Sequence, residues 1–232
     1  MNDAACRRRV GYLPENPAFY DFLSAHQFLQ LVGDTFKMEK ALIRNESDRV
    51  LTLLDLRHAD RRPIRSYSKG MVQRLGLAQA LLHDPDLYIL DEPMSGLDPL
   101  GRALVKQIIL DLKNRGKTVF FSTHVTADVE AVCDRVAIIN SGKLQAVKHV
   151  SDLLEKGIEG YLVHLAGGSD KLCEEFNTNT RSGGSQEIFV PRKDLNRFMA
   201  AVAKEGAEVL LIEPRRRDLE QFFLEIVKRE KE

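Results

Sequence analysis

Two adjacent acids, Asp91 and Glu92, directly follow the short apolar run 87–90. If this run is a buried strand of a parallel sheet, its carboxyl end lies at the edge where open α/β sheets bind ligands. One carboxylate at that edge can hold Mg²⁺, usually through water, while the other polarises an attacking water. The alternative interpretation is that the two acids only cap a helix or stabilise a turn after a core strand.

A second apolar run, 119–121, ends in Ser122, Thr123 and His124, which predicts an imidazole at the same edge of the sheet. Neutral imidazole can contact a γ-phosphate and hold the attacking water. The segment 95–98 adds a carboxylate, Asp98, near the same edge. A lone histidine is more often structural or solvent-facing, but the companion strand with its two acids favours a functional role.

Ser68, Lys69, Gly70 and Met71 stand at the start of a predicted helix. Free backbone N–H groups at a helix N-terminus, together with a hydroxyl, a flexible glycine and a cation, suit a phosphate. Taken alone, the tetrapeptide is better explained by an ordinary serine N-cap.

The elements that must position these residues alternate along the first 150 residues. The apolar runs 10–13, 87–90, 119–121 and 136–139 predict strands buried on both faces of a sheet. Helices are predicted after Ser68, ending before Pro85, and from Asp98-Pro99 to Gly116. Strand, helix and strand in succession imply a parallel sheet with right-handed crossovers. Residues 20–67 show helical periods and no convincing strand, which predicts a helical insertion.

The chain after residue 150 predicts a small α+β appendage. Strands are expected at 161–165, 187–190 and 209–212, and amphipathic helices at 195–202 and 219–226. A polar loop over 177–186 is expected to be mobile. We therefore expect two domains, 1–150 with a helical subdomain at about 20–85, and an accessory region at 151–232.

Composition excludes several classes of protein. The 232 residues contain 34 basic and 34 acidic residues, so the net charge of zero argues against a nucleic-acid partner bound through a global basic surface. Three separated cysteines give neither a disulfide framework nor a CxxC metal site. No apolar run approaches the ~18 residues of a membrane span, so a role at a membrane would need another chain to hold the protein there.

Taken in order and spacing, the motifs resemble the nucleotide-binding subunits of ATP-binding-cassette (ABC) transporters. The likeness lies in YSKGMVQRLGLAQALLHDPDLYILDEPMSGLDPLGR and TVFFSTH and covers about residues 10–147. It implies a P-loop NTPase-like α/β fold in which the helical insertion is the family's helical subdomain. It also implies ATP and Mg²⁺ as cofactors and an ATPase reaction.

The resemblance assigns roles at matching positions only. Residues 68–71 match the signature motif, Asp91 the Walker B acid that positions Mg²⁺, and Glu92 the catalytic glutamate. The segment 95–98, with Asp98, matches the D-loop, and His124 matches the switch histidine that contacts the γ-phosphate. The stretch VGYLPE resembles the Q-loop region, which places Glu15 at the Q-loop position.

Three departures from the family pattern are visible. Lys69 replaces the first glycine of the signature motif, and Glu15 places an anion where the family has a neutral side chain. The phosphate-binding Walker A loop, GxxxxGK[ST], is absent from the 232 residues, and GDTFKMEK at Gly33 is no substitute because it lacks the second glycine and the adjacent Lys-Ser/Thr pair. We therefore expect a cassette that is incomplete at its N-terminus, binds ATP poorly by itself and leaves an apolar sheet face exposed.

Two functional hypotheses follow from the resemblance. In the first, the complete protein is the ATP-hydrolysing subunit of an exporter, peripheral on the inner face of the cell membrane and bound to a permease and a second ATPase subunit as a homo- or heterodimer. In the second, the chain is a non-hydrolytic partner that lends its signature motif to an intact cassette. A DNA-repair ATPase is disfavoured by the absence of a long heptad repeat and of a basic excess, and a tandem-cassette translation factor by the single set of motifs.

Overall fold

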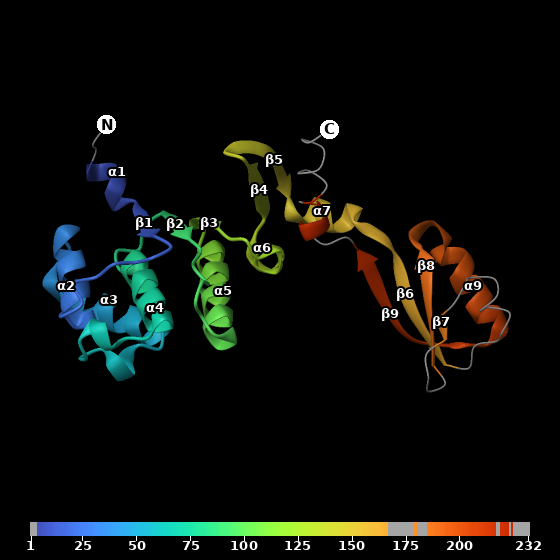
Figure 1. The fold of residues 1–232 in the computed structure, drawn as a ribbon, viewed down its shortest axis with the longest axis horizontal. Helices are drawn as coiled ribbons and strands as arrows, with labels where there is room; N and C mark the ends of the chain where they lie inside the picture. Colours follow the sequence, from blue (N-terminus) through green and yellow to red (C-terminus); the bar gives the residue numbers. More distant parts are fainter. Residues whose placement is uncertain (1–3, 167–178, 181–184, 217–218, 223, 225–232) are drawn as a thin grey trace. The chain divides into compact units, whose positions relative to one another are not determined.

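The computed structural model describes residues 4–166, 179–180, 185–216, 219–222 and 224. The chain divides into two compact units, Met1–Val132 and Cys133–Glu232 (Figure 1). This division lies before residue 150, because the hairpin that follows Val132 clusters with the second unit. The assignment of 1–150 and 151–232 as functional domains stays a prediction.

A three-stranded parallel sheet forms the centre of the first unit. Its strands β1 (Val10–Leu13), β2 (Leu87–Asp91) and β3 (Thr118–Ser122) lie in the order β1-β2-β3. These strands and their parallel arrangement were predicted from the apolar runs and are confirmed. The register places Asp91 opposite Ser122, so the polar residues that end β2 and β3 lie side by side.

One face of this sheet is covered by helices. Figure 1 shows α4 (Lys69–Leu81) and α5 (Pro99–Asn114) on the same side of the three strands. The approach of α4 to β1 is close, because a Cβ atom at Gly11 would lie 2.4 Å from the carbonyl oxygen of Ala80. A side chain at position 11 would therefore push α4 away from the sheet.

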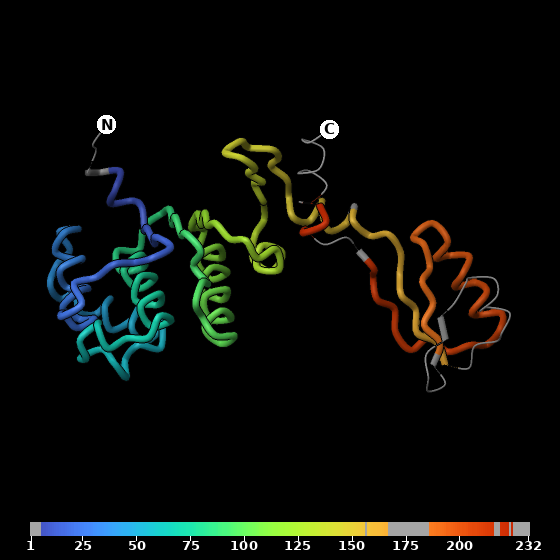
Figure 2. The backbone as a smooth tube through the Cα atoms, viewed as in Figure 1, coloured from blue at the N-terminus to red at the C-terminus, as the bar shows by residue number. Residues whose placement is uncertain are grey.

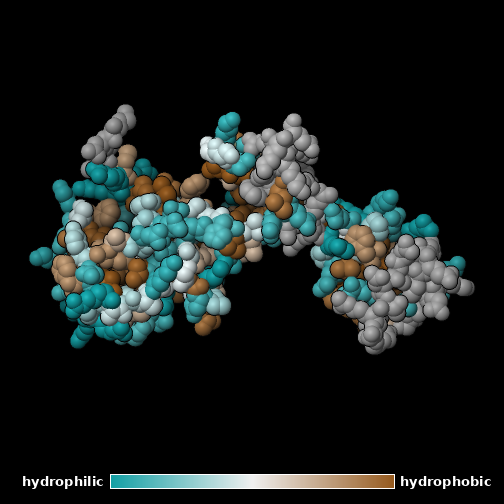
Figure 3. All heavy atoms as spheres, viewed as in Figure 1, coloured by the Kyte–Doolittle hydropathy of each residue, from teal (hydrophilic) through white to brown (hydrophobic). Residues whose placement is uncertain are grey.

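The opposite face carries a row of exposed apolar side chains. Tyr12, Ile89 and Phe120 are neighbours across the three strands and are 52%, 36% and 59% exposed. The prediction that these strands are buried on both faces was therefore wrong for the described residues. An exposed apolar face agrees with the expectation for an incomplete sheet. Figure 3 shows brown apolar atoms at several places on the surface of the part of the molecule that contains β1 to β3.

The predicted helical insertion is confirmed as a group of helices without a strand. Its elements are α2 (Ala25–Thr35), α3 (Lys40–Leu53), η1 (Arg57–Ala59) and η2 (Ile64–Ser66). Two further short helices of the first unit lie outside the insertion, α1 (Ala4–Arg8) and α6 (Thr126–Val132). Helix α2 begins with a capping box in which Ser24 and Gln27 exchange hydrogen bonds. The amide of Ile64 donates to the carbonyl of Leu23 at 2.9 Å, which fixes the segment that leads to Ser68.

The second unit is antiparallel throughout its described strands. Strands β4 (Arg135–Asn140) and β5 (Lys143–His149) form a hairpin, so the expectation that 136–139 belongs to the parallel sheet was wrong. The other elements are α7 (Val150–Lys156), β6 (Ile158–Ala166), β7 (Asn179–Thr180), β8 (Ser185–Pro191), η3 (Arg192–Asp194), α9 (Leu195–Glu205) and β9 (Glu208–Arg216).

Strands β6 to β9 form one sheet in the order β7-β8-β6-β9, which confirms the predicted α+β character. Phe198 and Val202 of α9 pack on Val163 and Ile188 of this sheet. The backbone tube in Figure 2 follows β6, β8 and α9 through this part of the chain. Most of the predicted polar loop 177–186 and part of the predicted helix 219–226 lie outside the described residues.

Helices in the described part of the chain fall short of the length and apolar character that crossing a bilayer requires.

A buried acid fixes α6 against α5. Asp128 is 2% exposed and lies 2.7 Å from Nη2 of Arg102 and 2.8 Å from Nζ of Lys106. Two cations on one helix thus hold a single carboxylate on the helix that follows His124.

At the opposite end of the sheet, Asp84 connects the turns that precede β2 and β3. Its carboxylate accepts a hydrogen bond from Arg115 at 2.7 Å and lies 3.2 Å from Nζ of Lys117, which connects the turn before β2 to the turn before β3. Partial burial alone would raise the pKa of Asp84, but the hydrogen bonds and charges of Arg115 and Lys117 outweigh it and hold the pKa below its usual value. Asp84 therefore stabilises the fold in its charged form.

We expect Asp84→Asn to lower the free energy of unfolding at pH 7 by about 0.5–1 kcal/mol, because the carboxylate is half-exposed and its ion pairs are screened. Asparagine tolerates the positive φ of 45° at this position, so the substitution removes the charge and little else. Because the folded pKa is depressed, the difference between the two proteins should disappear as the pH falls through that pKa. Urea unfolding at several pH values measures it, with Asp111→Asn as control; a difference that persists in acid would contradict the electrostatic origin.

Candidate functional site

The carboxyl edge of the parallel sheet brings together Asp91, Glu92, Ser122 and His124. The hydroxyl of Ser122 donates to Oδ1 of Asp91 and accepts a hydrogen bond from the amide of Glu92 at 3.1 Å. One serine thus engages both acids, because β2 and β3 end in register.

Glu92 is held by the residue that follows the neighbouring strand. Its Oε1 atom accepts from the amide of His124 at 3.1 Å and lies 2.8 Å from Nδ1 of the imidazole. The Glu92 side chain is 20% exposed, whereas the His124 side chain is 80% exposed. The predicted meeting of a carboxylate and an imidazole at one sheet edge is therefore present.

The backbone of Glu92 is unusual, because its φ of +45° lies in the left-handed region that L-residues rarely adopt. Its carbonyl oxygen accepts from the amide of Ser95 at 3.0 Å and from Nε2 of Gln73 at 3.1 Å. Gln73 belongs to α4 and is 4% exposed, so a buried amide from the helix contacts the strained peptide.

Residues 68–71 form the beginning of α4. The hydroxyl of Ser68 accepts from the amide of Met71 at 3.3 Å, so this serine is a helix N-cap. Ser68 and Lys69 are exposed, Gly70 is half-buried and Met71 is buried. An N-cap with exposed flanking residues is compatible with a phosphate site and does not by itself identify one.

The first turn of α4 lies against the turn at 95–98. A Cβ atom built on Gly96 would lie 2.9 Å from Cε of Lys69, and one built on Gly70 would lie 3.4 Å from the carbonyl oxygen of Gly96. The predicted signature segment and the predicted D-loop segment therefore contact each other within one chain.

Asp98 and Glu15 lie nearby in different settings. The Asp98 carboxylate accepts from the amide of Gly101 at 2.9 Å and caps α5, so its observed role is structural. Glu15 is exposed in the bend two residues after the end of β1, at the same edge of the sheet. Their predicted roles in nucleotide binding stay predictions.

Sequence reasoning missed the roles of Ser122 and Gln73. The position of Ser122 one residue after an apolar run, like Asp91 after its own run, was the available signal for a contact between them. A glutamine among the apolar residues of the predicted helix was the signal for Gln73, because an amide that becomes buried needs a hydrogen-bond partner.

The donor set at this edge fits Mg²⁺ better than a metal with an all-protein cage. Among the described residues there is no group of three or more His, Cys, Asp or Glu side chains suited to hold a metal ion. Mg²⁺ is usually bound through one or two carboxylates together with water and substrate phosphates. Asp91, partly exposed at the end of β2, can supply such a carboxylate.

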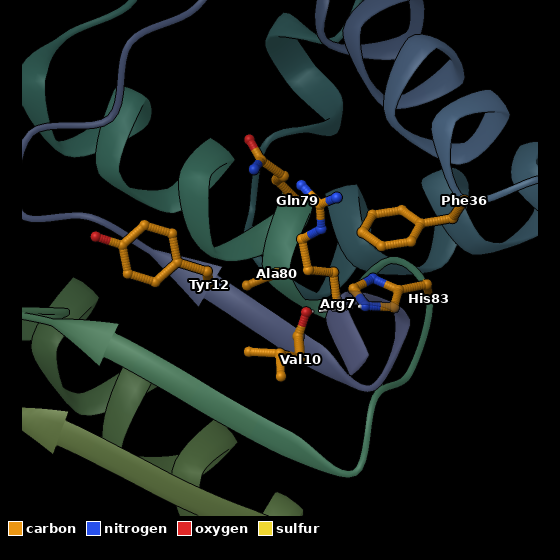
Figure 4. Close-up of a pocket in the computed structure, with 7 residues that line it drawn as sticks. All are labelled: Arg7, Val10, Tyr12, Phe36, Gln79, Ala80 and His83. Atoms are coloured by element: carbon orange, nitrogen blue, oxygen red, sulfur yellow. Dashed lines mark hydrogen bonds between the residues drawn. The ribbon is translucent and has the colours of Figure 1, made fainter. Parts of the chain in front are cut away.

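A separate hollow of about 220 Å³ lies beside the opposite end of β1 (Figure 4). His83 and Phe36 line it as a stacked pair whose ring centroids are 3.8 Å apart. Burial lowers the pKa of His83, and its Nε2 lies 3.2 Å from the carbonyl oxygen of Val10. A neutral imidazole that donates to Val10 accounts for this arrangement, which links the turn after α4 to the start of β1.

Comparison with known proteins gives a consistent result. Residues 1–95 match the protein family described as ABC transporter. The chain is 40% identical over 231 residues to an uncharacterized ABC transporter ATP-binding protein of Synechocystis, in a match that covers 97% of this chain and 64% of that relative. It is 32% identical over 229 residues to the bacitracin transport ATP-binding protein BcrA of Bacillus licheniformis, covering 95% of this chain and 73% of BcrA.

Among solved structures, the fold is similar to a chain described as the ATP binding subunit of an ABC transporter. The TM-score is 0.58 at 24% sequence identity, with 85% of this chain and 69% of that chain covered. This likeness supports the α/β fold. The chain thus spans 64% to 73% of the length of these relatives and of this structure.

We expect Gly96→Ala to destabilise the first unit more than Gly116→Ala. Both glycines have positive φ, +70° and +75°, but only at Gly96 would the new methyl group meet another side chain within 4 Å. The shared backbone cost is about 1 kcal/mol, and displacement of the exposed, flexible Lys69 side chain should add a smaller penalty at Gly96. Urea unfolding measures both, and a Gly96→Ala/Lys69→Ala double variant should recover the difference. Equal losses in the two single variants would show that the contact with Lys69 is unimportant.

Proposed function

Because the chain belongs to the family of ABC transporter ATP-binding proteins, we propose that it is the ATP-binding and ATP-hydrolysing subunit of a transporter that drives export. The observation that carries this proposal is the Glu92 carboxylate held by His124 beside Asp91 at the carboxyl edge of the sheet. Export rather than import rests on the likeness of residues 68–83 and 95–102 to exporter-like cassettes.

Glu92 is the proposed general base. Its carboxylate is mostly buried and accepts two hydrogen bonds from His124, which would hold it at the sheet edge until it is released to orient and activate a water. The strained backbone of Glu92 is consistent with such a role, because strain of this kind clusters at functional sites.

His124 is the proposed γ-phosphate contact. While Nδ1–H donates to Glu92, the Nε2 atom of a neutral ring carries a lone pair, which would face phosphate oxygens unfavourably. Contact with phosphate therefore needs either a second proton on the ring or release of Glu92. In this arrangement His124 and Glu92 restrain each other, and arrival of the phosphate frees the carboxylate for water.

ATP and Mg²⁺ are the proposed ligands. When bound, Mg²⁺ would neutralise charge that develops on the phosphates. Asp91 would hold it, with Ser122 fixing the carboxylate through its hydroxyl. Glu15 and Asp98 would lie at the margins of the nucleotide, and residues 68–71 would close over a nucleotide held by a second subunit.

A membrane permease and a second ATPase subunit are the proposed partners, with the chain at the inner face of the cell membrane. Phe19 to Phe36 would form the permease contact. Tyr20 and Phe22 in this segment are 59% and 67% exposed, and their ring centroids are 6.1 Å apart. Exposed aromatic pairs of this kind are typical of protein interfaces.

A second candidate is a non-hydrolytic partner cassette that supplies residues 68–71 to an intact subunit. It is supported by the exposure of Ser68 and Lys69 at the N-cap of α4, where a nucleotide held by another subunit could reach them. In this case one competent site per heterodimer is expected, and a homodimer would have none.

We expect Glu92→Gln to lower the kcat for ATP hydrolysis at least about 100-fold in the transporter isolated from cells with its permease, because the base is lost while ATP binding is retained. Glu39→Gln, at the exposed start of α3, is the matched control and should leave kcat unchanged. Phosphate release and binding of a fluorescent ATP analogue measure the two quantities. Unchanged turnover in Glu92→Gln would remove Glu92 as the base.

For the partner-cassette candidate, the 232-residue chain is mixed with an intact ATPase subunit that has its own phosphate loop. We expect ATP turnover above that of the intact subunit alone, and we expect Ser68→Arg to abolish the increase because the longer cation occupies the phosphate position. Ser151→Arg, exposed on α7, is the control. Turnover by the isolated chain equal to that of the mixture would exclude this candidate.

A further inference from the structure

The glutamine at position 73 is buried with its amide directed at the catalytic edge of the sheet. The side chain is 4% exposed, yet its neighbours Met71, Leu75 and Leu77 on α4 are buried apolar residues. Burying an amide costs free energy unless it is hydrogen-bonded. Its hydrogen bond is to the carbonyl oxygen of Glu92, nineteen positions along the chain, at 3.1 Å.

This contact is one of three that hold the Glu92 peptide in its strained conformation. Ser122 accepts from the Glu92 amide, while Gln73 and Ser95 donate to the Glu92 carbonyl. A residue at φ +45° keeps that conformation only where its surroundings fix it. Because the backbone dihedral angles set the direction of the Cα–Cβ bond, the same bonds aim the carboxylate at His124.

Gln73 also belongs to the helix that begins with the exposed residues Ser68 and Lys69. Ser68 caps this helix through Met71, and the amide of Val72 donates to the carbonyl of Ser68 at 2.9 Å. A regular helix moves as a rigid element over one turn, so a shift of its first turn also displaces Gln73. Such a displacement would act on the Glu92 carbonyl through the hydrogen bond from Gln73.

We propose that Gln73 is a positioning residue that ties the direction of the Glu92 carboxylate to the first turn of α4. Ligand contact at residues 68–71 would then change the direction of the Glu92 carboxylate of the same chain through a single buried hydrogen bond. This inference rests on the proposed function, because it assigns Glu92 as the base and residues 68–71 as a ligand-contacting turn.

The first test measures hydrogen exchange by NMR on the 232-residue chain. The amide of His124 donates to Glu92 Oε1 at 3.1 Å, so its exchange rate reports on the position of the Glu92 carboxylate. In Gln73→Met, a near-isosteric side chain without a donor, we expect the His124 amide to exchange about tenfold faster. Gln79→Met on the same helix is the matched control and should leave this rate unchanged.

The second test separates positioning from binding in the transporter isolated with its permease. We expect Gln73→Met to lower kcat about tenfold with KM changed less than about twofold, because a misdirected base slows chemistry without loosening the nucleotide. Gln73→Asn keeps the amide but is one methylene shorter, so it should lie between Gln73→Met and the wild type.

The outcomes distinguish this inference from the proposed function. If a folded Gln73 variant leaves both the His124 exchange rate and kcat as in the wild type, the inference is overturned. If neither variant folds, fast exchange of the Gln73 side-chain amide in the unmodified chain overturns it, and slow exchange supports it. Unchanged turnover in Glu92→Gln would instead overturn the assignment of the base, whatever the exchange rates show.

Discussion

The pairing of Asp91 with Ser122 at the ends of two parallel strands is the constraint on which the rest of the site depends. In-register strands deliver an acid and a hydroxyl to the same point, and the hydroxyl engages the side chain of Asp91 and the amide of Glu92. Without that serine, the peptide after β2 would lose one of the three contacts that hold Glu92 in the conformation directed at His124. A single register thus sets the relative positions of the carboxylate proposed to bind Mg²⁺ and the proposed base.

Helices on the covered face of the sheet also contact the segments that hold Glu92 and His124. Helix α4 contacts the Glu92 carbonyl through Gln73, and α5 holds α6 through the buried carboxylate of Asp128. Because α6 begins two residues after His124, the ion pairs of Asp128 limit how far the imidazole can move from Glu92. The positions of Glu92 and His124 are therefore tied to the packing of whole helices.

Much of this architecture could be predicted from the sequence, and the failures have physical causes. The runs 10–13, 87–90 and 119–121 gave the three parallel strands, because each is short, apolar and followed by polar or turn-forming residues. The run 136–139 looks the same but pairs with the unpredicted strand β5, since local composition does not encode the strand that will be its neighbour. The local sequence pattern likewise did not predict that Tyr12 and Phe120 are exposed, because burial depends on which elements cover that face of the sheet.

At the candidate site, residue types predicted the carboxylates and the imidazole but not the hydrogen bonds that orient them. Gln73 and Ser122 contact the backbone of Glu92. Because every residue has the same backbone groups, such a contact leaves little trace in the sequence. The same contacts make the spacing between β2 and α5 inflexible. Adding or removing one codon in the seven-residue stretch between Asp91 and Pro99 would disturb the partners of the Glu92 peptide, so a change in gene length should be better tolerated in the second unit.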